Sequence, residues 1–463
     1  MRIDILAIGS RGDVQPYLAL GLGLQSAGHA VRLVTLGGFE ELVHGRGLGH
    51  LSLVGSPGSI ASGTAGRDWI ERRDSTIGFL RGFVRVAPPL IEAGISSYWE
   101  ASRDAEAIIA SPLGLLVGVH VAERLGVPLI RTQFAPRPDW AGRGDLVTAI
   151  RSDLKALLGE AFLFLIWSRL RPRTNAARRS VLGLPPLPLR EPFSALDEKR
   201  IPVLDAYSPA VVPRPKEWGD WIHVTGYWFL EDPPEWVPPG KLVDFLSSGP
   251  PPVFVGFGST PFPRPEATAD LVVRALARAS HRGVLVAGGS GLPVGRLSEE
   301  VLSLDSVPHG WLFPRVHAVV HHGGAGVTGA ALRAGLPSVV VPVFADQPFW
   351  GQRVFDLGAG PRPIPAKRLT EDVLASALRL TDSEEMRRRA AALGEQIRRE
   401  NGVARAVETI DRHLGATRPS KAAPVSERPR ARALEEDQGQ NRGVGGRGLD
   451  PKRPRRADTV PFE

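Results

Sequence analysis

Short apolar runs alternate with helix-like stretches along the first part of the chain. Apolar residues at helical spacing predict helices at residues 14–28 and 115–125. The short apolar runs around them predict buried strands at residues 3–9, 30–35, 106–110 and 128–132. Strands and helices that alternate in this way form a parallel sheet covered by helices on both faces.

The same alternation returns after residue 252. Strands are expected at 253–258, 283–288, 318–321 and 338–342, and helices at 265–279, 327–334, 384–400 and 403–414. Asp382 and Glu385 are placed to form a capping pair at the start of helix 384–400. A second α/β domain is therefore predicted, and no sequence repeat links it to the first.

The segment between the two patterns, residues 171–249, is rich in proline and tryptophan and poor in periodicity, which favours an irregular connector. We expect an N-terminal domain over residues 1–200, a connector over 201–249, a C-terminal domain with its closing helices over 250–415, and a tail over 416–463.

The tail carries eleven Lys and Arg residues against seven Asp and Glu, so it supplies +4 of the formal net charge of +8. Basic tails can bind nucleic acid. Here prolines, glycines and acids separate the arginines, and no aromatic platform for base stacking is interleaved. A solvated, disordered tail is the favoured interpretation, without a nucleic-acid partner.

The chain has 463 residues, 43% of them hydrophobic, which is enough for two full cores. The absence of cysteine excludes disulfides and thiolate metal sites, and a cytoplasmic protein is predicted. The longest apolar run, residues 156–167, is broken by Gly159 and Glu160 and falls short of the roughly 20 residues that cross a membrane. The first apolar stretch contains Asp4 and ends in a turn, so a signal peptide is not expected.

A glycine-rich turn follows the predicted strand 318–321, where His321 and His322 precede Gly323, Gly324 and Gly326. The N-terminus of the next helix leaves backbone N–H groups unpaired and carries about half a positive charge. Glycines let a phosphate approach that backbone closely, and a histidine beside it adds a hydrogen-bond donor. The turn is a candidate anion site. A tight packing turn is the alternative, and the histidine pair makes it the weaker one.

Three segments, 307–316, 321–328 and 341–350, resemble the donor-binding signature of family 1 glycosyltransferases. The start of the chain, residues 9–16, is similar to the same branch, that of the sterol glucosyltransferases and the bacterial natural-product (glycopeptide- and macrolide-type) glycosyltransferases. The resemblance implies the α/β fold called GT-B, with two facing Rossmann-like domains. It places a nucleotide-sugar donor on the C-terminal half and an acceptor on the N-terminal half, and it implies no metal or other cofactor.

The resemblance also assigns the donor contacts. By position, His322 would contact the diphosphate together with the backbone around Gly324 and Gly326, and Ser259 would be a second phosphate donor. The family usually has threonine directly after the glycine turn, whereas here Thr328 stands one position later, after a valine. A contact from the Thr328 hydroxyl is therefore in doubt.

Asp346 and Gln347 would hydrogen-bond hydroxyl groups of the sugar, and the 307–311 loop would lie by the nucleotide base. His309 in this loop either touches the donor or has no role. Trp311 is expected in the core rather than stacked on the base.

Asp13 lies in the turn after the first strand, beside Ser10, Arg11 and Gly12, at the end of a parallel sheet where ligands bind. Inverting transfer needs a base that takes the acceptor proton, and a carboxylate can do this. In the family branch the matching aspartate is the proposed base. Asp13 could instead cap the helix that begins near Val14, and the two roles are compatible. Arg11 either neutralises phosphate across the cleft or pairs with a surface acid.

Other polar groups form no further pattern. The remaining histidines show no metal-ligand spacing, and neighbours on a strand, such as His321 and His322, face opposite sides. The apolar run 156–167 either lines a pocket for a lipophilic acceptor, touches a membrane surface, or belongs to the core.

We therefore expect an inverting glycosyltransferase that uses a UDP- or dTDP-sugar and a hydroxylated, lipophilic acceptor. A non-catalytic partner built on the same scaffold is an alternative, although the base and donor residues are present. A dinucleotide-dependent oxidoreductase fits less well, because the first strand is not followed by G-x-G-x-x-G.

Overall fold

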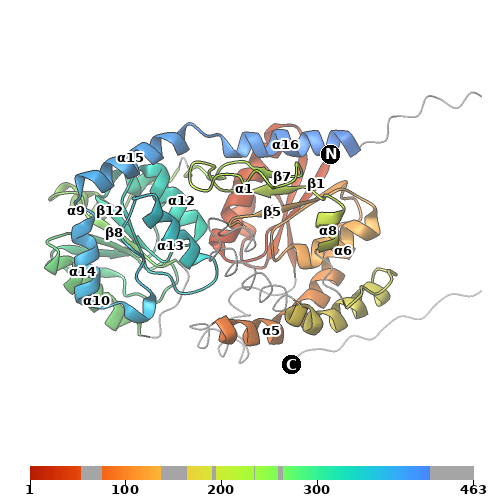
Figure 1. The fold of residues 1–463 in the computed structure, drawn as a ribbon, viewed down its shortest axis with the longest axis horizontal. Coiled ribbons are helices and arrows are strands. Elements are labelled where there is room, and N and C mark those ends of the chain that lie inside the picture. The colour runs from red at the N-terminus through yellow and green to blue at the C-terminus, as the bar shows by residue number, and fades with distance from the viewer. Residues whose placement is uncertain (54–75, 137–163, 190–193, 234, 259–263, 418–463) are drawn as a thin grey trace, which may run out of the picture. The chain divides into compact units, whose positions relative to one another are not determined.

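The computed structural model describes residues 1–53, 76–136, 164–189, 194–233, 235–258 and 264–417 (Figure 1). Residues 1–418 form one compact unit, within which the described residues build a seven-stranded and a six-stranded sheet. Ser259, the tail from 418 onward and most of the apolar run 156–167 lie outside the described residues. No helix in the described ranges is both long and apolar enough to span a bilayer.

The first sheet is parallel throughout, in the order β3-β2-β1-β4-β5-β6-β7. Its strands are β1 (Arg2–Leu6), β2 (Ala30–Leu36), β3 (Gly49–Leu53), β4 (Ala107–Ala110), β5 (Leu129–Gln133), β6 (Val203–Asp205) and β7 (Ile222–Val224). The helices of this half include α1 (Arg11–Ser26), α2 (Glu40–His44), α5 (Thr76–Ala101), α6 (Leu115–Leu125) and α8 (Ser194–Glu198). Residues 164–180 are helical as well, so the segment expected as an irregular connector begins in a helix.

Part of the segment expected as an irregular connector belongs to the first sheet. β6 pairs with β5, and β7 pairs with β6, both in parallel. Each strand has three residues, too short for a periodic pattern to show in the sequence. Residues 203–224 therefore complete the N-terminal sheet rather than only linking two domains.

The second sheet has the order β10-β11-β9-β8-β12-β13 and is parallel except for the edge pair β10–β11. Its strands are β8 (Val253–Gly256), β9 (Gly283–Val286), β10 (Gly295–Ser298), β11 (Val301–Leu304), β12 (Ala318–His321) and β13 (Ser338–Val340). The helices of this half are α9 (Gly240–Ser247), α10 (Pro265–Arg278), α11 (His309–Leu312), η2 (Phe313–Arg315), α12 (Ala325–Ala334), α13 (Gln347–Asp356), η3 (Ala366–Arg368), α14 (Glu371–Leu380) and α15 (Glu384–Arg398). The two sheets confirm the α/β fold class.

The last helix, α16 (Gly402–Thr417), packs on the first half rather than on the second (Figure 1). Its buried residues Ala406, Ile410 and Leu414 belong to the same core cluster as the apolar side chains of β1 and α1. Gly23 allows α1 and α16 to approach each other closely, since a Cβ at this position would lie 2.5 Å from Val403 Cγ1. The helix expected to close the C-terminal domain thus ties the chain back to the N-terminal half.

Helix α15 begins differently from the expected capping pair of Asp382 and Glu385. Ser383 is its N-cap, and the Ser383 hydroxyl accepts a hydrogen bond from the Met386 backbone N–H. The Asp382 carboxylate instead contacts His317, 2.8 Å away. The expected pair is wrong because serine occupies the position whose oxygen reaches the free N–H groups.

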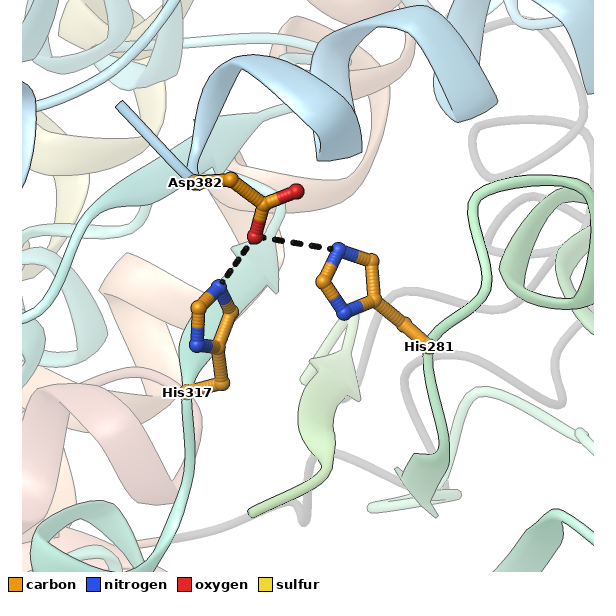
Figure 2. Close-up of side chains that lie close together, drawn as sticks. All are labelled: His281, His317 and Asp382. Atoms are coloured by element: carbon orange, nitrogen blue, oxygen red, sulfur yellow. Dashed lines mark hydrogen bonds and ion pairs between the residues drawn. The ribbon is translucent and has the colours of Figure 1, made fainter. Parts of the chain in front are cut away.

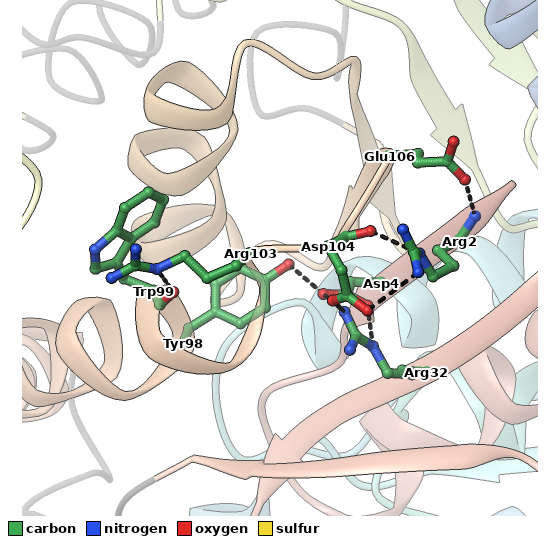
Figure 3. A network of polar contacts seen from close by, with 8 residues as sticks. All are labelled: Arg2, Asp4, Arg32, Tyr98, Trp99, Arg103, Asp104 and Glu106. Carbon is green, nitrogen blue, oxygen red and sulfur yellow. Dashed lines mark hydrogen bonds and ion pairs between the residues drawn. The ribbon is translucent and has the colours of Figure 1, made fainter.

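A partly buried ion pair joins strands β1 and β2 of the first sheet (Figure 3). Asp4 and Arg32 are direct partners across β1 and β2, and Arg32 donates to both carboxylate oxygens, at 2.8 and 3.1 Å. Tyr98 of α5 donates to the same carboxylate at 3.0 Å. Burial raises the pKa of Asp4, and the hydrogen bond from Arg32 opposes that rise. The network joins two strands and a helix at the N-terminal end of the sheet.

Candidate active site

A cavity of about 2120 Å³ lies where the carboxyl ends of strands from both sheets meet. It exceeds the roughly 300–1,000 Å³ typical of one small-ligand pocket, which leaves room for two substrates. Ten of the residues singled out from the sequence line it: Ser10, Arg11, Gly12, Asp13, His309, His322, Gly324, Gly326, Asp346 and Gln347.

Asp13 is the third residue of helix α1, which begins at Arg11 rather than near Val14. Ser10 is the N-cap, and its backbone N–H and its hydroxyl both donate to Asp13 Oδ2, at 2.7 and 2.8 Å. Asp13 therefore supports the cap from inside the helix and is not the cap itself. Among the described residues no hydrogen bond reaches Oδ1, so this oxygen is left for a ligand in the cavity.

The surroundings of Asp13 favour a basic carboxylate. Burial raises its pKa, against the two hydrogen bonds from Ser10. Gly9 makes the burial possible, because it adopts a φ of +150° and a Cβ there would overlap the carboxylate. A carboxylate with a raised pKa accepts a proton more readily than an ordinary surface aspartate.

Arg11, next to Asp13, is exposed and lines the cavity. No acidic partner for it occurs in the part of the chain that the structure describes, so the surface ion pair considered from the sequence gains no support. Its charge acts across the cavity, where it helps to lower the pKa of His309.

The two neighbouring histidines before the glycine turn have different surroundings. His321 is fully buried, and its Nδ1 accepts the Gly323 backbone N–H at 3.0 Å. His322 lines the cavity instead. Burial lowers the pKa of His321 to about 3 and that of His322 to about 4, so both rings are neutral near pH 7. His321 thus shapes the turn, while His322 offers its ring to a ligand.

The His322 ring lies between two glycines. A Cβ at Gly324 would lie 2.6 Å from its Nε2, and one at Gly258 would lie 2.9 Å from its Cε1. Gly324 is the N-cap of α12, so this Nε2 sits beside the unpaired N–H groups of the helix start. His322 Nδ1 is buried with no hydrogen-bond partner among the described residues. The arrangement suits an anion bound at the helix start.

His309 is held by aromatic neighbours at the start of α11. Its ring stacks on Phe313 with centroids 4.6 Å apart, and Phe254 meets it edge-on at 5.5 Å. Burial, with the nearby His322 and Arg11, lowers its pKa to about 4. His309 is therefore a neutral, fixed wall of the cavity.

Asp346 and Gln347 enter the cavity at the start of α13. Burial raises the pKa of Asp346, the hydrogen bond from Trp350 Nε1 (2.9 Å) opposes this, and the charge of Asp13 adds to the rise. The two carboxylates thus act on each other across the cavity. Gln347 Oε1 accepts the backbone N–H groups of Val343 and Phe344, at 2.8 and 3.1 Å. Of the Gln347 side chain, only the Nε2 amino group is left to reach a ligand.

Thr328 does not line the cavity, which corrects the expectation for its side chain. The residue is fully buried, and its hydroxyl donates to the Gly324 carbonyl at 2.8 Å. A helical threonine hydroxyl can donate to the carbonyl four residues back, and here the Gly324 carbonyl accepts both this hydroxyl and the Thr328 backbone N–H. Any phosphate contact at this turn then falls to the backbone and to His322.

Two other expectations concern apolar side chains. Trp311 packs on Trp236, with ring centroids 5.2 Å apart, and does not line the cavity. Of the apolar run 156–167, the structure describes residues 164–167. Phe164 and Leu165 are exposed and Trp167 is buried, and none of these lines the cavity.

The sequence alone did not identify the aromatic wall of the cavity. Tyr227, Trp228 and Phe229 line it from the segment after β7, and Phe134 lines it from the end of β5. The rings of Phe134 and Trp228 meet edge-on at 6.1 Å. Three consecutive aromatic residues in an aperiodic segment were the available signal, and they require the fold to be placed.

Further basic and acidic side chains line the cavity. They include Arg46, Arg131, Arg333, Arg398, Asp197, Glu231 and Asp232. Glu231 pairs with Arg333 at 3.3 Å, and burial raises the pKa of Asp232.

Comparison with known proteins agrees with this architecture. Residues 3–138 match the glycosyltransferase family 28 N-terminal domain, and residues 271–407 match the erythromycin biosynthesis protein CIII-like C-terminal domain. Solved structures at 19% sequence identity share the fold. The glycosyltransferase of kitacinnamycin has a TM-score of 0.64 over 89% of this chain and 99% of that one, and the calicheamicin glycosyltransferase has 0.63 over 90% and 100%.

The two-sheet α/β fold and the family matches are those of the glycosyltransferase class. A sterol 3-beta-glucosyltransferase of Arabidopsis thaliana is 36% identical over 442 residues, covering 92% of this chain and 68% of the relative. A sterol 3-beta-glucosyltransferase of Cryptococcus neoformans is also 36% identical, covering 89% of this chain but 27% of its own length. The chain belongs to the glycosyltransferase family that contains these proteins, and it spans about a quarter of the length of the fungal relative.

Proposed function

We propose that this chain is an inverting glycosyltransferase that moves a sugar from a nucleotide-diphosphate donor to a hydroxyl group of a lipophilic, sterol-like acceptor. One observation carries the proposal. A single cavity brings together Asp13, in the first turn of the helix after β1, and the glycine turn with His322 after β12. A base and an anion site on opposite walls are what this transfer requires.

The donor diphosphate is assigned to the start of α12. Backbone N–H groups at a helix start bind phosphate, and Gly324 and Gly326 leave that backbone open. His322, neutral near pH 7, would donate an Nε2–H hydrogen bond to the diphosphate and stabilise the negative charge that develops as it leaves. Asp346 and the Gln347 amide would hold the sugar hydroxyls.

The acceptor is assigned to the first half. Its hydroxyl would give its proton to Asp13 Oδ1 while its oxygen attacks the anomeric carbon and the bond from that carbon to the diphosphate oxygen breaks. The products are the glycoside and the nucleoside diphosphate, with the proton on Asp13. Phe134 and Trp228 supply an apolar wall suited to a sterol-like skeleton, which agrees with the names of the 36% identical relatives.

A titration with UDP, dTDP and GDP tests the donor site, and the tightest ligand identifies the nucleotide. Incubation of the matching donor sugar with a panel of sterols and other hydroxylated lipophilic compounds then tests transfer. The expected product is heavier than the acceptor by one sugar residue. Nucleotide binding without transfer to any acceptor would favour the non-catalytic partner protein, and absence of binding would overturn the donor site.

A further inference from the structure

A second polar cluster lies in the C-terminal half, away from the cavity (Figure 2). His281 stands just before β9, His317 just before β12, and Asp382 between α14 and α15. None of the three lines the cavity. Because His317 and His322 flank opposite ends of the same strand, the cluster occupies the sheet edge opposite the glycine turn.

The two imidazoles converge on one carboxylate oxygen. Asp382 Oδ1 lies 2.8 Å from His317 Nε2 and 3.5 Å from His281 Nε2. The rings lie side by side, with centroids 5.0 Å apart and planes 30° from parallel. The His281 and His317 side chains are 13% and 16% exposed, and that of Asp382 is 49% exposed. The cluster is thus walled by protein on the histidine side and open to water on the carboxylate side.

One of these donor atoms has no hydrogen bond. His281 Nε2 is buried and has no hydrogen-bond partner among the described residues, although it points at Asp382. A buried ring nitrogen without a partner has lost its hydrogen bond to water and gained none in return, so a ligand that satisfied it would be favoured. This observation is independent of the clustering itself.

The spacing of the donors fits a small transition-metal ion. Metal–ligand distances of about 2.0–2.1 Å in a tetrahedral site put neighbouring donor atoms about 3.3 Å apart. The two nitrogen–oxygen separations, 2.8 and 3.5 Å, bracket that value. All three ligand atoms lie within 4.8 Å of one another, so rotations of the three side chains would bring them to the tetrahedral spacing.

We propose that His281, His317 and Asp382 form a binding site for a divalent transition-metal ion such as Zn²⁺, with water in the fourth position. Two imidazoles and one carboxylate are a common donor set for such ions. The same residues suit Mg²⁺ and Ca²⁺ poorly, because these ions take oxygen ligands.

The charge of the surroundings limits the affinity. Neutral imidazoles and one carboxylate leave a bound Zn²⁺ with one uncompensated positive charge, and the Arg387 guanidinium acts on His317 as well. The site is therefore weaker than a closed site with four protein ligands. Its effect is structural, because the ion joins the turn between α14 and α15 to the starts of two central strands.

The test uses the untagged full chain after treatment with a chelator. Titration calorimetry with ZnCl₂ is expected to show saturable binding of one equivalent of Zn²⁺. Thermal unfolding is expected at a higher temperature when Zn²⁺ is present. His281→Gln and His317→Gln should each weaken that equivalent by more than about 100-fold, because each removes a direct ligand. Co²⁺ bound at the site should give the intense visible absorption of tetrahedral coordination.

A matched control is another contacting histidine pair, His223 and His413, whose Nε2 atoms lie 3.0 Å apart. His413→Gln should bind one equivalent of Zn²⁺ with the wild-type affinity. No saturable equivalent in the wild type, or an equivalent that survives in both ligand variants, would overturn the site. Circular dichroism of the variants without metal separates ligand loss from misfolding, and no readout depends on sugar transfer.

Discussion

Gly324→Ala tests the geometry of the proposed diphosphate site, because it acts on His322 without touching that residue. The new Cβ would lie 2.6 Å from His322 Nε2, whereas ordinary contact begins at 3.4 Å. The ring must therefore retreat by about 0.8 Å. Gly324 has a φ of −62°, which alanine adopts freely, so backbone strain adds nothing.

A shift of about 0.8 Å lengthens a hydrogen bond from about 2.8 Å to about 3.6 Å, where it no longer forms. A hydrogen bond to a charged group contributes about 1.5–3 kcal/mol, so affinity for UDP or dTDP should fall about 10- to 150-fold. Calorimetric titration of the nucleoside diphosphate measures this directly, and thermal unfolding checks that the variant is folded.

A double-mutant cycle isolates the cause. In a His322→Ala background there is no ring to displace, so Gly324→Ala should cost little further affinity. Gly326→Ala is the companion variant, because a Cβ there meets nothing within 4 Å. It should leave His322 in place and lower affinity only if the diphosphate itself lies against that backbone. Wild-type affinity in Gly324→Ala, or full additivity with His322→Ala, would refute the reasoning.

Two further predictions concern stability. His120 is buried, and its Nδ1 accepts from Arg178 at 3.1 Å, so burial and that cation lower its pKa to about 3. The folded chain holds His120 neutral, whereas the unfolded chain protonates it below a pKa of 6.5. The contribution of His120 to the free energy of unfolding is therefore complete above pH 6.5 and is lost as the pH falls toward 3. Between pH 7 and pH 5 the wild type should lose about 2 kcal/mol more than His120→Gln in urea unfolding, and parallel profiles would contradict this. Gly23→Ala should destabilise the chain by about 1–3 kcal/mol through its clash with Val403, whereas Gly415→Ala in α16, with open space around it, should be neutral or slightly stabilising. Equal unfolding temperatures for the two variants would show that α1 and α16 do not pack as described.

Strong local patterns made the central strands of both sheets and several of their helices predictable from the sequence. Helix α6 and strand β12 have the predicted bounds, because each is an uninterrupted pattern and α6 ends at Gly126 in the left-handed conformation. Helix α12 begins two residues earlier than predicted, since Ala325 and Gly326 carry no apolar signal. Strands β3, β6, β7, β10 and β11 and helices α2, α5, α9, α13 and α14 were not predicted. Strands β6 and β7 are short and lie in a segment rich in proline and tryptophan, where no period shows.

Contacts between distant segments were harder to predict. Asp13 and His322 follow strands of different sheets, so no strand pattern relates them, and only the resemblance to a family with two facing domains implied a common cleft. The aromatic wall and the return of α16 depend on tertiary packing that no local pattern records. His281, His317 and Asp382 are far apart in the sequence, and so they showed no metal-ligand spacing there.

The most direct test of the proposed transfer is the Asp13→Asn variant. Asparagine keeps the size of the side chain and can still accept the bonds from Ser10, but it cannot take a proton from the acceptor. Glu40→Gln is the matched control, since Glu40 also accepts a backbone N–H at a helix start, from Gly38 at 2.7 Å, and does not line the cavity.

The rate of sugar transfer is the decisive measurement, made beside nucleoside-diphosphate affinity in the same preparations. The proposed mechanism predicts a loss of about 10²- to 10⁴-fold in Asp13→Asn with unchanged nucleotide affinity, and wild-type values for Glu40→Gln. Full transfer activity in Asp13→Asn would contradict the assignment of Asp13 as the base.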